Sequence, residues 1–580
     1  MANIKRKPHT STITDFINKI NKDKICLPDF QREFVWKPEQ WAKLIESVIR
    51  QYPIGTLMFL NADVNHKFGK RSFRNTDPQT FNPDYFVIDG QQRLNTFYLL
   101  LRRPDKFEPY DSIEYNGKNY KIFFKITTKI EYLPPDVDKP QFIIAERIEK
   151  EDKTDYEKQG KKRLIPIEFI LYEEYTNQWI KSALNHLRKS SIVTYKKNIL
   201  NVRKLIEDYT CFIEIIENEL KSQDHYNIFE LLNEAGTDLT IFDLLVAKLN
   251  SIDIKLRELW ETSQKDHPEL KNYDLDPVYI LKTISLIRGT KNELDNDRQP
   301  TCAKQDLIRL YRKYGQKNGK KEFIEDWYDA CNYLEKSLKE MKNSYGVYNK
   351  KYIPYSPMII TLAAIKWWFE KFNKYDQRYK RNMQNRIKKW YWGSILNREY
   401  DARTDNKISY HYCDLRKWVG PQRTKRIPQG LNFQFSKKKI QDIFNNIDSS
   451  ADARYKAIIS IPLMEKKARD IYSNEFLLDE KLHDHHIFPE GFLRENGIKD
   501  REVINNIANR MLITDKTNQE IKKKNPQEYL QNVSSKILKN HFFISKAVVY
   551  KSSQFKKIYE EFCEDRKERI CNFLYNYLNS

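Results

Sequence analysis

The sequence lacks several features that define common protein classes. Its seven cysteines form no C-x-x-C pair, so neither a zinc knuckle nor a disulfide framework is expected, and a reducing cytosol fits this pattern. The first ten residues, MANIKRKPHT, contain no apolar segment, so no signal peptide is read and a cytoplasmic location is expected. The longest apolar stretch, 357–369, is short and contains Lys366, which predicts a core helix and no membrane partner.

The chain also shows no internal repeat and no long low-complexity linker. It has no G-x-x-x-x-G-K-[S/T] motif, because the segment from Gly315 to Lys321 has the wrong spacing. Any nucleotide hydrolysis would therefore not use a P-loop. At 580 residues the chain is too long for one ordinary core, and two or three domains are expected.

Positive charge is in excess, with a formal net charge of +22. Abundant lysine, asparagine, isoleucine and tyrosine are also typical of an AT-rich genome, so the distribution of charge is more informative than its total. Residues 371–426 carry 16 Lys/Arg against five Asp/Glu, together with ten aromatic residues. Because cations bind phosphates and aromatic faces stack on bases, this segment, with Lys388 and Lys389, is a candidate DNA-binding surface.

The alternative for this basic segment is a solvated helix whose aromatic side chains belong to a core. The aromatics in question include Tyr379, Trp390, Tyr391, Trp392 and Trp418.

Hydrophobic patterning predicts a chain of class α+β with a helical middle. The expected elements are a helix at 40–50, strands at 57–60 and 85–88, a charged loop at 149–163, mostly helices at 195–395, a polar, turn-rich junction at 397–430, and helices from 526 onward. The domains drawn from this pattern are 1–250, 251–396 and 397–580.

Three of the chain's ten histidines fall within four residues, in the stretch LHDHHIFPEGF. Two adjacent histidines alone are usually surface residues, but here they precede Ile-Phe-Pro and two spaced asparagines. Neighbours on a strand point to opposite faces, so one imidazole would hold a metal while the other polarises water. We assign His485 to the metal and His486 to the general base, and interpret His483 as a loop or substrate-side residue.

The two asparagines complete this pattern. Asn509, in NNIANRMLI, would hydrogen-bond and orient the base, and Asn518, in TDKTNQEI, would supply a second metal ligand. An imidazole with amide or water oxygens suits Mg²⁺ or Mn²⁺ better than zinc, and Asp484 is a candidate outer-sphere partner. This order of parts is that of an HNH nuclease, a ββα-metal site that hydrolyses phosphodiesters. Glu490 departs from the lysine that many such sites carry after the proline.

A second constellation lies near the N-terminus, where the apolar run 85–88 predicts a buried strand. It is followed by Asp-Gly-Gln-Gln-Arg and by a helix expected to begin near Leu94. A strand, a glycine turn and a helix start together make an anion site, and Arg93 can add a fork to phosphate oxygens. The alternative is that Asp89 simply caps the helix.

Glutamines accompany both arginines in this part of the chain. Gln91 and Gln92 can position a water or a ribose, and Gln31 with Arg32 forms another Gln-Arg pair upstream.

Several motifs together resemble a known family. LPDFQREFVWKPEQWAKLIESVIRQYPIGTLMFL with VIDGQQRLNT resembles the N-terminal domain of the GmrSD-type restriction family, and FELLNEAGTDLTIFDLL resembles that domain's later motif. HHIFPEGF with IANRMLITDKTNQEI is similar to the family's C-terminal HNH nuclease domain. The middle of the chain is weakly matched.

This resemblance implies a ParB-like N-terminal domain that binds or hydrolyses a nucleotide, GTP or ATP, and a nuclease that cuts modified phage DNA. The nucleotide-binding residues implied are Gln31, Arg32, Asp89, Gly90, Gln91, Gln92 and Arg93, with Asn233 and Thr237 as weaker candidates.

We therefore expect a nucleotide-responsive, metal-dependent DNA endonuclease of the type IV restriction kind, which acts in antiviral defence. Cutting both strands with one site per chain favours a homodimer. Two alternatives stay open: a DNA-binding regulator that does not cleave, and an HNH nuclease toxin directed at RNA.

Overall fold

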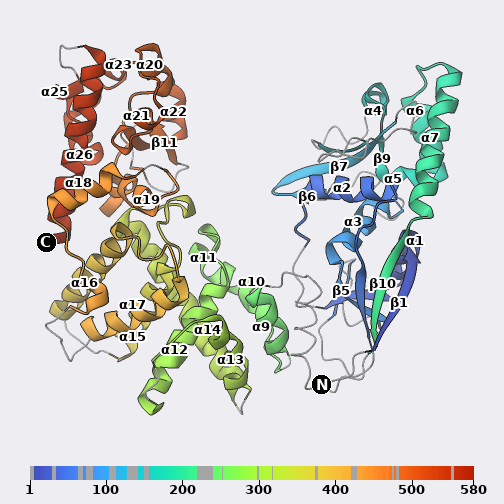
Figure 1. Ribbon diagram of the computed structural model, residues 1–580, viewed down its shortest axis with the longest axis horizontal. Helices are drawn as coiled ribbons and strands as arrows, with labels where there is room; N and C mark the ends of the chain where they lie inside the picture. The colour runs from blue at the N-terminus through green and yellow to red at the C-terminus, as the bar shows by residue number, and fades with distance from the viewer. Residues whose placement is uncertain are drawn as a thin grey trace. The chain divides into compact units, whose positions relative to one another are not determined.

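The computed structural model describes most of the chain as two compact units, Met1–Lys255 and Leu256–Ser580 (Figure 1). Residues outside the description are 1–4, 29–33, 63–69, 74–81, 104–112, 127–141, 149–155, 218–239, 251, 297–298, 316–317, 373–376, 420–426, 448, 467, 473, 475, 478–481, 550–553 and 580. The predicted segments 251–396 and 397–580 lie almost entirely in the second unit.

A six-stranded mixed sheet forms the centre of the N-terminal unit, in the order β1-β10-β3-β5-β2-β4. Its strands are β1 (Lys5–Thr12), β2 (Ile25–Pro28), β3 (Leu57–Asn61), β4 (Lys70–Arg71), β5 (Tyr85–Asp89) and β10 (Thr210–Glu217). The first strand pairs antiparallel with β10, which in turn runs parallel to β3. The central strands β3 and β5 are antiparallel and carry continuous buried runs, as strands covered on both faces do.

Helices pack on this sheet and extend its core. They are α1 (Ile13–Asn21), α2 (Pro38–Ile49), α3 (Gln91–Leu101) and α7 (Lys189–Glu207). A capping box starts α1, in which the Thr12 hydroxyl accepts from the Asp15 amide and the Asp15 carboxylate accepts from the Thr12 amide. The buried core includes Phe16, Phe59 and Phe97, whose removal from water is the main source of stability here.

A smaller antiparallel sheet completes the N-terminal unit, with β7 pairing to β6, β8 and β9. The elements are β6 (Ile113–Tyr115), β7 (Lys118–Lys125), β8 (Ile143–Arg147), β9 (Leu164–Pro166), α4 (Tyr156–Lys162), α5 (Ile167–Ile170), α6 (Glu173–Ala183) and, at the end of the unit, α9 (Ile241–Asn250).

The C-terminal unit is mainly helical. Its first part comprises α10 (Leu256–Asp266), α11 (Pro268–Asn272), α12 (Val278–Asn296), α13 (Lys304–Tyr314), α14 (Gly319–Tyr345), η3 (Lys350–Tyr352), α15 (Met358–Phe372), α16 (Gln377–Leu396), α17 (Thr404–Val419), η4 (Gln429–Leu431), α18 (Lys437–Asn445), α19 (Ala453–Ile459) and η5 (Ile461–Lys466). The histidine region follows, with β11 (Leu482–His486), α20 (Glu490–Glu495), α21 (Arg501–Ile504), η6 (Ile507–Asn509), β12 (Arg510–Thr514), α22 (Asp515–Ile521), α23 (Pro526–Tyr529), α24 (Ser535–Phe542), α25 (Lys546–Val549) and α26 (Phe555–Asn579).

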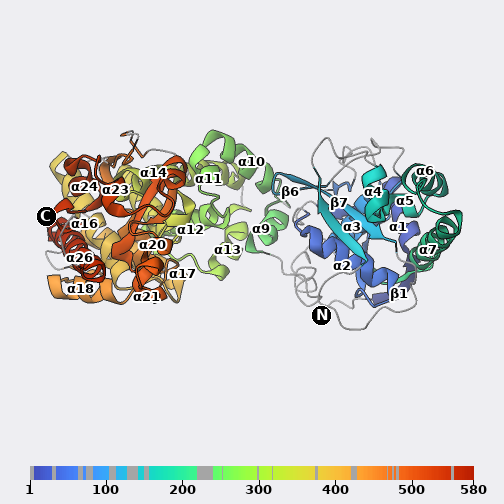
Figure 2. The ribbon, with the colours of Figure 1, turned by 90° about the horizontal axis from the view of Figure 1, so that it is seen from above.

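The long terminal helix α26 packs against α18, and the two lie side by side in two views (Figures 1 and 2). It also packs against α16, where the rings of Trp392 and Tyr577 meet edge to face at 6.4 Å between centroids. Tyr391, also on α16, stacks on Tyr345 of α14 with 3.8 Å between the ring centroids. The packing of α26 on α16 joins the predicted middle and C-terminal segments into one packed body.

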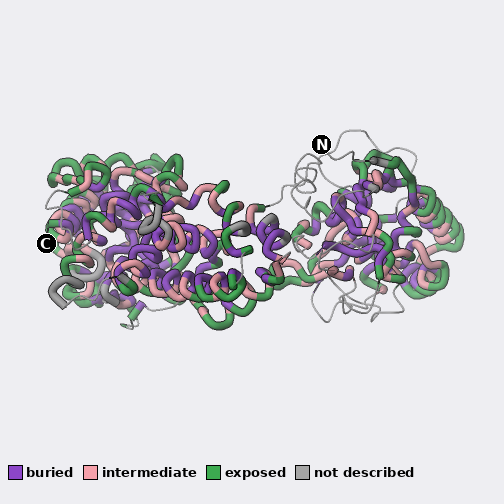
Figure 3. Tube along the Cα trace, turned by 90° about the horizontal axis from the view of Figure 1, so that it is seen from below, coloured by how far each residue is buried: buried purple, intermediate pink, exposed green. Residues whose placement is uncertain are grey.

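The aromatic residues of the basic segment are therefore core residues. Trp390, Tyr391, Trp392 and Trp418 are all buried, with at most 5% of their surface exposed, so they are not available to stack on bases. The side chain of Tyr379 lies outside the described residues. Figure 3 shows how buried residues line the interior of each unit while exposed ones follow the outer sides of the helices.

The predicted elements are partly confirmed. The helix at 40–50 and the strands at 57–60 and 85–88 correspond to α2, β3 and β5, and the apolar stretch at 357–369 forms the buried helix α15. The described part of 195–395 is mostly helical, as predicted, and also contains the strand β10. Two expectations are wrong in part, because α4 occupies the second half of the predicted loop and α17 lies inside the predicted turn-rich junction. Among the described helices, none is both long and apolar enough to cross a bilayer.

Candidate functional site

The histidine cluster lies on β11, which pairs antiparallel with β12, and α22 follows β12 directly. The register places His485 opposite Met511 and His486 opposite Arg510. The Thr514 hydroxyl accepts a hydrogen bond from the Thr517 amide and so caps the start of α22. The strand alternation puts the two histidines on opposite faces of this hairpin.

The His485 side chain meets Asn518 of α22, the residue predicted to share the metal with it. Asn518 lies close enough to the ring to favour its charged form, while the Nε2 atom of His485 is buried and has no hydrogen-bond partner among the described residues. Burial lowers the pKa of His485 to about 4, so the imidazole is neutral at physiological pH. Nearby on the same face, His483 Nε2 lies 3.2 Å from the Asp515 carboxylate.

On the other face, the Nε2 atom of His486 has two neighbours. It lies 3.0 Å from Asn505 Oδ1 and 2.5 Å from a guanidinium nitrogen of Arg510. Burial, followed by the Arg510 charge, lowers the pKa of His486, so this ring too is neutral. A neutral Nε2 either donates to the amide oxygen or accepts from the guanidinium, so the two contacts are alternatives.

Asp484 is engaged in a buried network and is not directed towards the His485 face. Its carboxylate accepts from Arg510 Nε at 2.8 Å and from the Tyr455 hydroxyl at 2.7 Å, and only 8% of the side chain is exposed. Asp484 thus anchors Arg510, the arginine that lies beside His486, and is not placed for the suggested outer-sphere role.

Asn509 has a different set of partners from the one predicted. Its side chain is fully buried, accepts from the Phe488 amide at 2.7 Å, and donates to the carbonyls of Phe488 and Ile504 at 3.1 and 3.0 Å. Its own carbonyl accepts from the Ile487 amide. Asn509 thus fixes the backbone immediately after His486, whereas the direct contact with the imidazole belongs to Asn505.

The donor set of this hairpin fits a hard, weakly chelated cation. Within the described part of the chain, no group of three or more His, Cys, Asp or Glu side chains gathers to hold a metal. The pair His485 and Asn518, with the unpartnered buried Nε2 atom, offers two ligands, as Mg²⁺ sites that retain several waters do.

The DGQQR segment adopts the strand–turn–helix geometry expected from the sequence. Gly90 has φ of 97°, and a Cβ atom there would lie 2.2 Å from Leu57 Cδ2, so only glycine fits this turn. Gly90 is also the N-cap of α3, so the alternative that Asp89 caps the helix is wrong. Instead the Asp89 carboxylate accepts from Arg93 Nη2 at 2.9 Å.

The polar side chains after Gly90 are tied to the protein itself. Arg93 donates to the carbonyls of Ile54 and Thr56 at 2.7 and 3.1 Å, besides its pair with Asp89. Gln92 Oε1 accepts from two successive amides, Val35 at 3.0 Å and Trp36 at 3.2 Å. These bonds hold the segment that follows β2 against the start of α3.

Other predicted site residues are placed as follows. Gln91 is buried at the first position of α3. Gln31, Arg32, Asn233 and Thr237 lie outside the described residues.

The two lysines proposed for DNA binding differ in their surroundings. The ammonium of Lys388 lies 4.5 Å from the centroid of the Tyr577 ring, and burial lowers its pKa. Lys389 is exposed. Lys389 is therefore the more accessible of the two lysines for a phosphate contact, and Lys388 is partly buried.

Sequence reasoning missed three residues around His486: Asn505, Arg510 and Tyr455. Arg510 directly precedes the apolar run of β12 and faces the last histidine across the hairpin, which a strand register would have indicated. Asn505 and Tyr455 come from α21's end and from α19, so only the packed structure brings them to the site.

Comparisons with known proteins support the resemblance in the N-terminal half. Residues 13–250 match the family model described as the GmrSD restriction endonuclease, N-terminal domain. The chain is also 26% identical over 553 residues to the uncharacterized protein MJ0686 of Methanocaldococcus jannaschii, an alignment that covers 90% of this chain and 87% of that protein. The N-terminal unit is thus of the kind found in GmrSD-type restriction endonucleases.

Proposed function

We propose that the chain is a metal-dependent DNA endonuclease related to type IV restriction enzymes, with the reaction at the β11–β12–α22 hairpin. The observation that carries this proposal is that the two adjacent histidines of β11 have different partners on opposite faces of the strand. His485, with a buried and unpartnered Nε2 atom, meets Asn518 on one face, while His486 meets Asn505 on the other. The restriction endonuclease domain matched at residues 13–250 gives independent support.

In this proposal His485 and Asn518 would hold Mg²⁺ or Mn²⁺, which when bound supplies charge stabilisation for the leaving oxygen. The protein's own residues position the base. When His486 donates from Nε2 to Asn505 Oδ1, the lone pair lies on Nδ1, which then accepts a proton from the attacking water. Asn509 fixes the backbone on which this ring stands.

Space for a polyanion exists beside the base. A pocket of about 420 Å³ is lined by Asn505 itself, by two cationic side chains, Arg501 and Lys567, and by one carboxylate, Glu502. Lys567 also pairs with Glu564. Guanidinium and ammonium groups at this position suit the phosphates that flank a scissile bond.

We further propose that the N-terminal unit controls this reaction by binding a nucleotide, GTP or ATP, near Asp89–Arg93, and that modified phage DNA is the substrate. A nuclease needs no nucleotide for its chemistry, so a nucleotide site in the same chain implies regulation. By linkage, the nucleotide changes cleavage only if it binds the active and inactive states with different affinity.

The test is cleavage by the purified full-length chain of plain, hydroxymethylated, glycosylated and phosphorothioate DNA and of RNA, with Mg²⁺, with Mn²⁺ and with EDTA, each with and without GTP or ATP. DNA cleavage that requires the metal and falls ~10²–10⁴-fold in His486→Ala is the expected result. His267→Ala, a histidine of α11's N-cap that pairs with Glu335, is the matched control. Full activity in EDTA or in His486→Ala contradicts the proposal. If RNA is cut in preference to DNA, the substrate is RNA and the proposed DNA substrate is wrong.

A further inference from the structure

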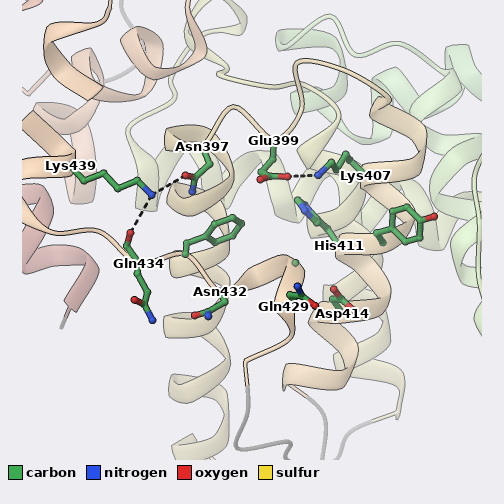
Figure 4. Close-up of a pocket in the computed structure, with 12 residues that line it drawn as sticks. Asn397, Glu399, Lys407, His411, Asp414, Gln429, Asn432, Gln434 and Lys439 are labelled. Carbon is green, nitrogen blue, oxygen red and sulfur yellow. Dashed lines mark hydrogen bonds and ion pairs between the residues drawn. The ribbon is translucent and has the colours of Figure 1, made fainter. Parts of the chain in front are cut away.

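A separate polar pocket of about 450 Å³ lies among the end of α16, α17, η4 and the start of α18 (Figure 4). This volume is in the range of pockets that hold small organic ligands. None of the residues assigned to the nuclease reaction lines it. Four side-chain amides do, from Asn397, Gln429, Asn432 and Gln434.

His411 supplies a buried hydrogen-bond donor to this pocket. Only 2% of the residue is exposed, and its Nδ1 atom accepts from Trp390 Nε1 at 3.0 Å. Because an indole N–H can only donate, Nδ1 must carry the lone pair, and the neutral ring therefore bears its proton on Nε2. No described residue accepts from Nε2, since the other contact of the ring, the Tyr400 hydroxyl, is also at Nδ1.

An acceptor lies on the other side of the ring. In Figure 4 His411 stands between Glu399 and Lys407 on one side and Asp414 on the other. Glu399 is already paired with Lys407, whereas Asp414 is half-buried and has no hydrogen-bond or ion-pair partner among the described residues. Gly430 faces this carboxylate, and a Cβ atom there would lie 3.1 Å from Asp414 Oδ2, so the glycine leaves the acceptor open.

The charges of the pocket nearly cancel. The Glu399–Lys407 pair neutralises itself, and the other two charged lining residues, Asp414 and Lys439, have opposite signs. The charge of Lys417 also acts on Asp414. A metal cation or a free phosphate thus gains little here. An uncharged, flat ring with donors and acceptors on its edge fits better, and Tyr410, 62% exposed on the pocket wall, offers a face for stacking.

We propose that this pocket binds a nucleobase, with the His411 imidazole donating to a ring acceptor and Asp414 accepting from a ring donor. The proposal rests on the proposed function, because nucleic acid bound for cleavage by this unit is the nearest source of such a base. Extrusion of a base from a duplex would bring a modified base into contact with the four amides, which is a way to read modification outside the nuclease site.

The experiment uses the full chain carrying His486→Ala, so that DNA is bound without being cut. Binding of a duplex with one mismatched 2-aminopurine is compared with that of the matched duplex, and the rise in 2-aminopurine fluorescence reports unstacking. A mispaired base costs less to extrude, so the mismatched duplex should bind more tightly. Adding His411→Asn, which keeps an acceptor for Trp390 but removes the Nε2 donor, should reduce this preference by roughly tenfold, the value of one hydrogen bond.

Gly430→Leu, which fills the space in front of Asp414, is the second variant in case His411→Asn lowers the yield of folded protein. His267→Asn is the matched control and should keep the mismatch preference. Equilibrium dialysis with free nucleosides is run in parallel. Binding of nucleosides in the absence of DNA indicates that the pocket takes a free base, and its absence indicates that the pocket takes only a base extruded from DNA.

An unchanged mismatch preference and unchanged nucleoside binding in both pocket variants, with normal thermal unfolding, overturns the proposal. Failure of the proposed nuclease function gives a different result. If the chain never cuts DNA but His411→Asn weakens binding of the mismatched duplex, the nucleobase pocket is supported and the nuclease function is contradicted. If the chain cuts DNA and neither pocket variant changes base binding, the nuclease function is supported and the pocket is contradicted.

Discussion

The Nε2 atom of His486 lies 3.0 Å from Asn505 Oδ1, so an exposed asparagine at the end of α21 orients the proposed base. Replacing Asn505 with alanine frees the ring to accept from Arg510 instead, which moves the proton to Nδ1. We expect Asn505→Ala to lower single-turnover cleavage by ~10–100-fold, as the loss of an orienting partner does in other sites. Unaltered cleavage would show that the contact is incidental.

Asn509 should behave differently, because its role is to hold the backbone. Asn509→Ala removes three buried hydrogen bonds and leaves the Phe488 amide without its acceptor. We expect a loss of about 3 kcal/mol in the free energy of unfolding of the C-terminal unit, measured by denaturant titration. Asn505→Ala is the control and should change this free energy by less than about 0.5 kcal/mol. Equal losses in the two variants would contradict the division of roles.

The two lysines of α16 give a second matched pair. Lys389→Glu should weaken DNA binding for all sequences and lower the slope of log affinity against log salt by about 1, because one phosphate contact is lost. Lys388→Glu should instead reduce thermal stability, because its ammonium rests on Tyr577. A salt slope that is the same in wild type and Lys389→Glu would identify this helix face as merely solvated.

Arg93→Ala should impair nucleotide binding or hydrolysis and change the response of DNA cleavage to nucleotide. The guanidinium joins the carbonyls of Ile54 and Thr56 to Asp89, so its loss releases the turn that begins α3. The measurement is cleavage against nucleotide concentration for wild type and Arg93→Ala, at a temperature where both are folded by circular dichroism. Identical curves would remove Arg93 from the sensor, and no response in either protein would end the regulatory proposal.

His411 predicts a pH dependence of stability. Burial lowers its pKa from the ordinary 6.5 to about 3, so its stabilising effect is complete above pH 6.5 and is lost as the pH falls towards 3. Between pH 7.5 and pH 5 the C-terminal unit should lose about 2 kcal/mol of unfolding free energy through this group. His411→Asn removes the titrating ring. The difference in unfolding free energy between wild type and variant should therefore narrow by about 2 kcal/mol between pH 7.5 and pH 5. A constant difference between the two proteins would contradict burial of a neutral imidazole.

The sequence indicated those parts of the fold whose signal is local. The apolar runs at 57–60 and 85–88 predicted buried strands because a strand covered on both faces needs no polar alternation. Helix α17 was missed because polar residues dominate its segment. Its apolar face, Ile408, Tyr412, Leu415 and Trp418, is nevertheless spaced by four, three and three residues.

The same distinction applies to the site. The histidines and Asn518 were recognisable because a hairpin and the next helix bring near neighbours together. The partner of His486 was misplaced because Asn505 and Asn509 lie on the same short segment, and only the buried bonds of Asn509 decide which of them faces the ring. The alternative that Asp89 caps α3 is wrong for a related reason, since its carboxylate meets Arg93 one helical turn on and not the helix amides.

The pairing of β1 with β10 sets the order in which the N-terminal unit can form during synthesis. Lys5–Thr12 lies against Thr210–Glu217, and β10 also separates β1 from β3. During synthesis β1 therefore has no strand partner until ~200 more residues have followed, a wait of ~10–40 s at usual elongation rates. During that time the unpaired edges of β1 are open to pairing with other chains.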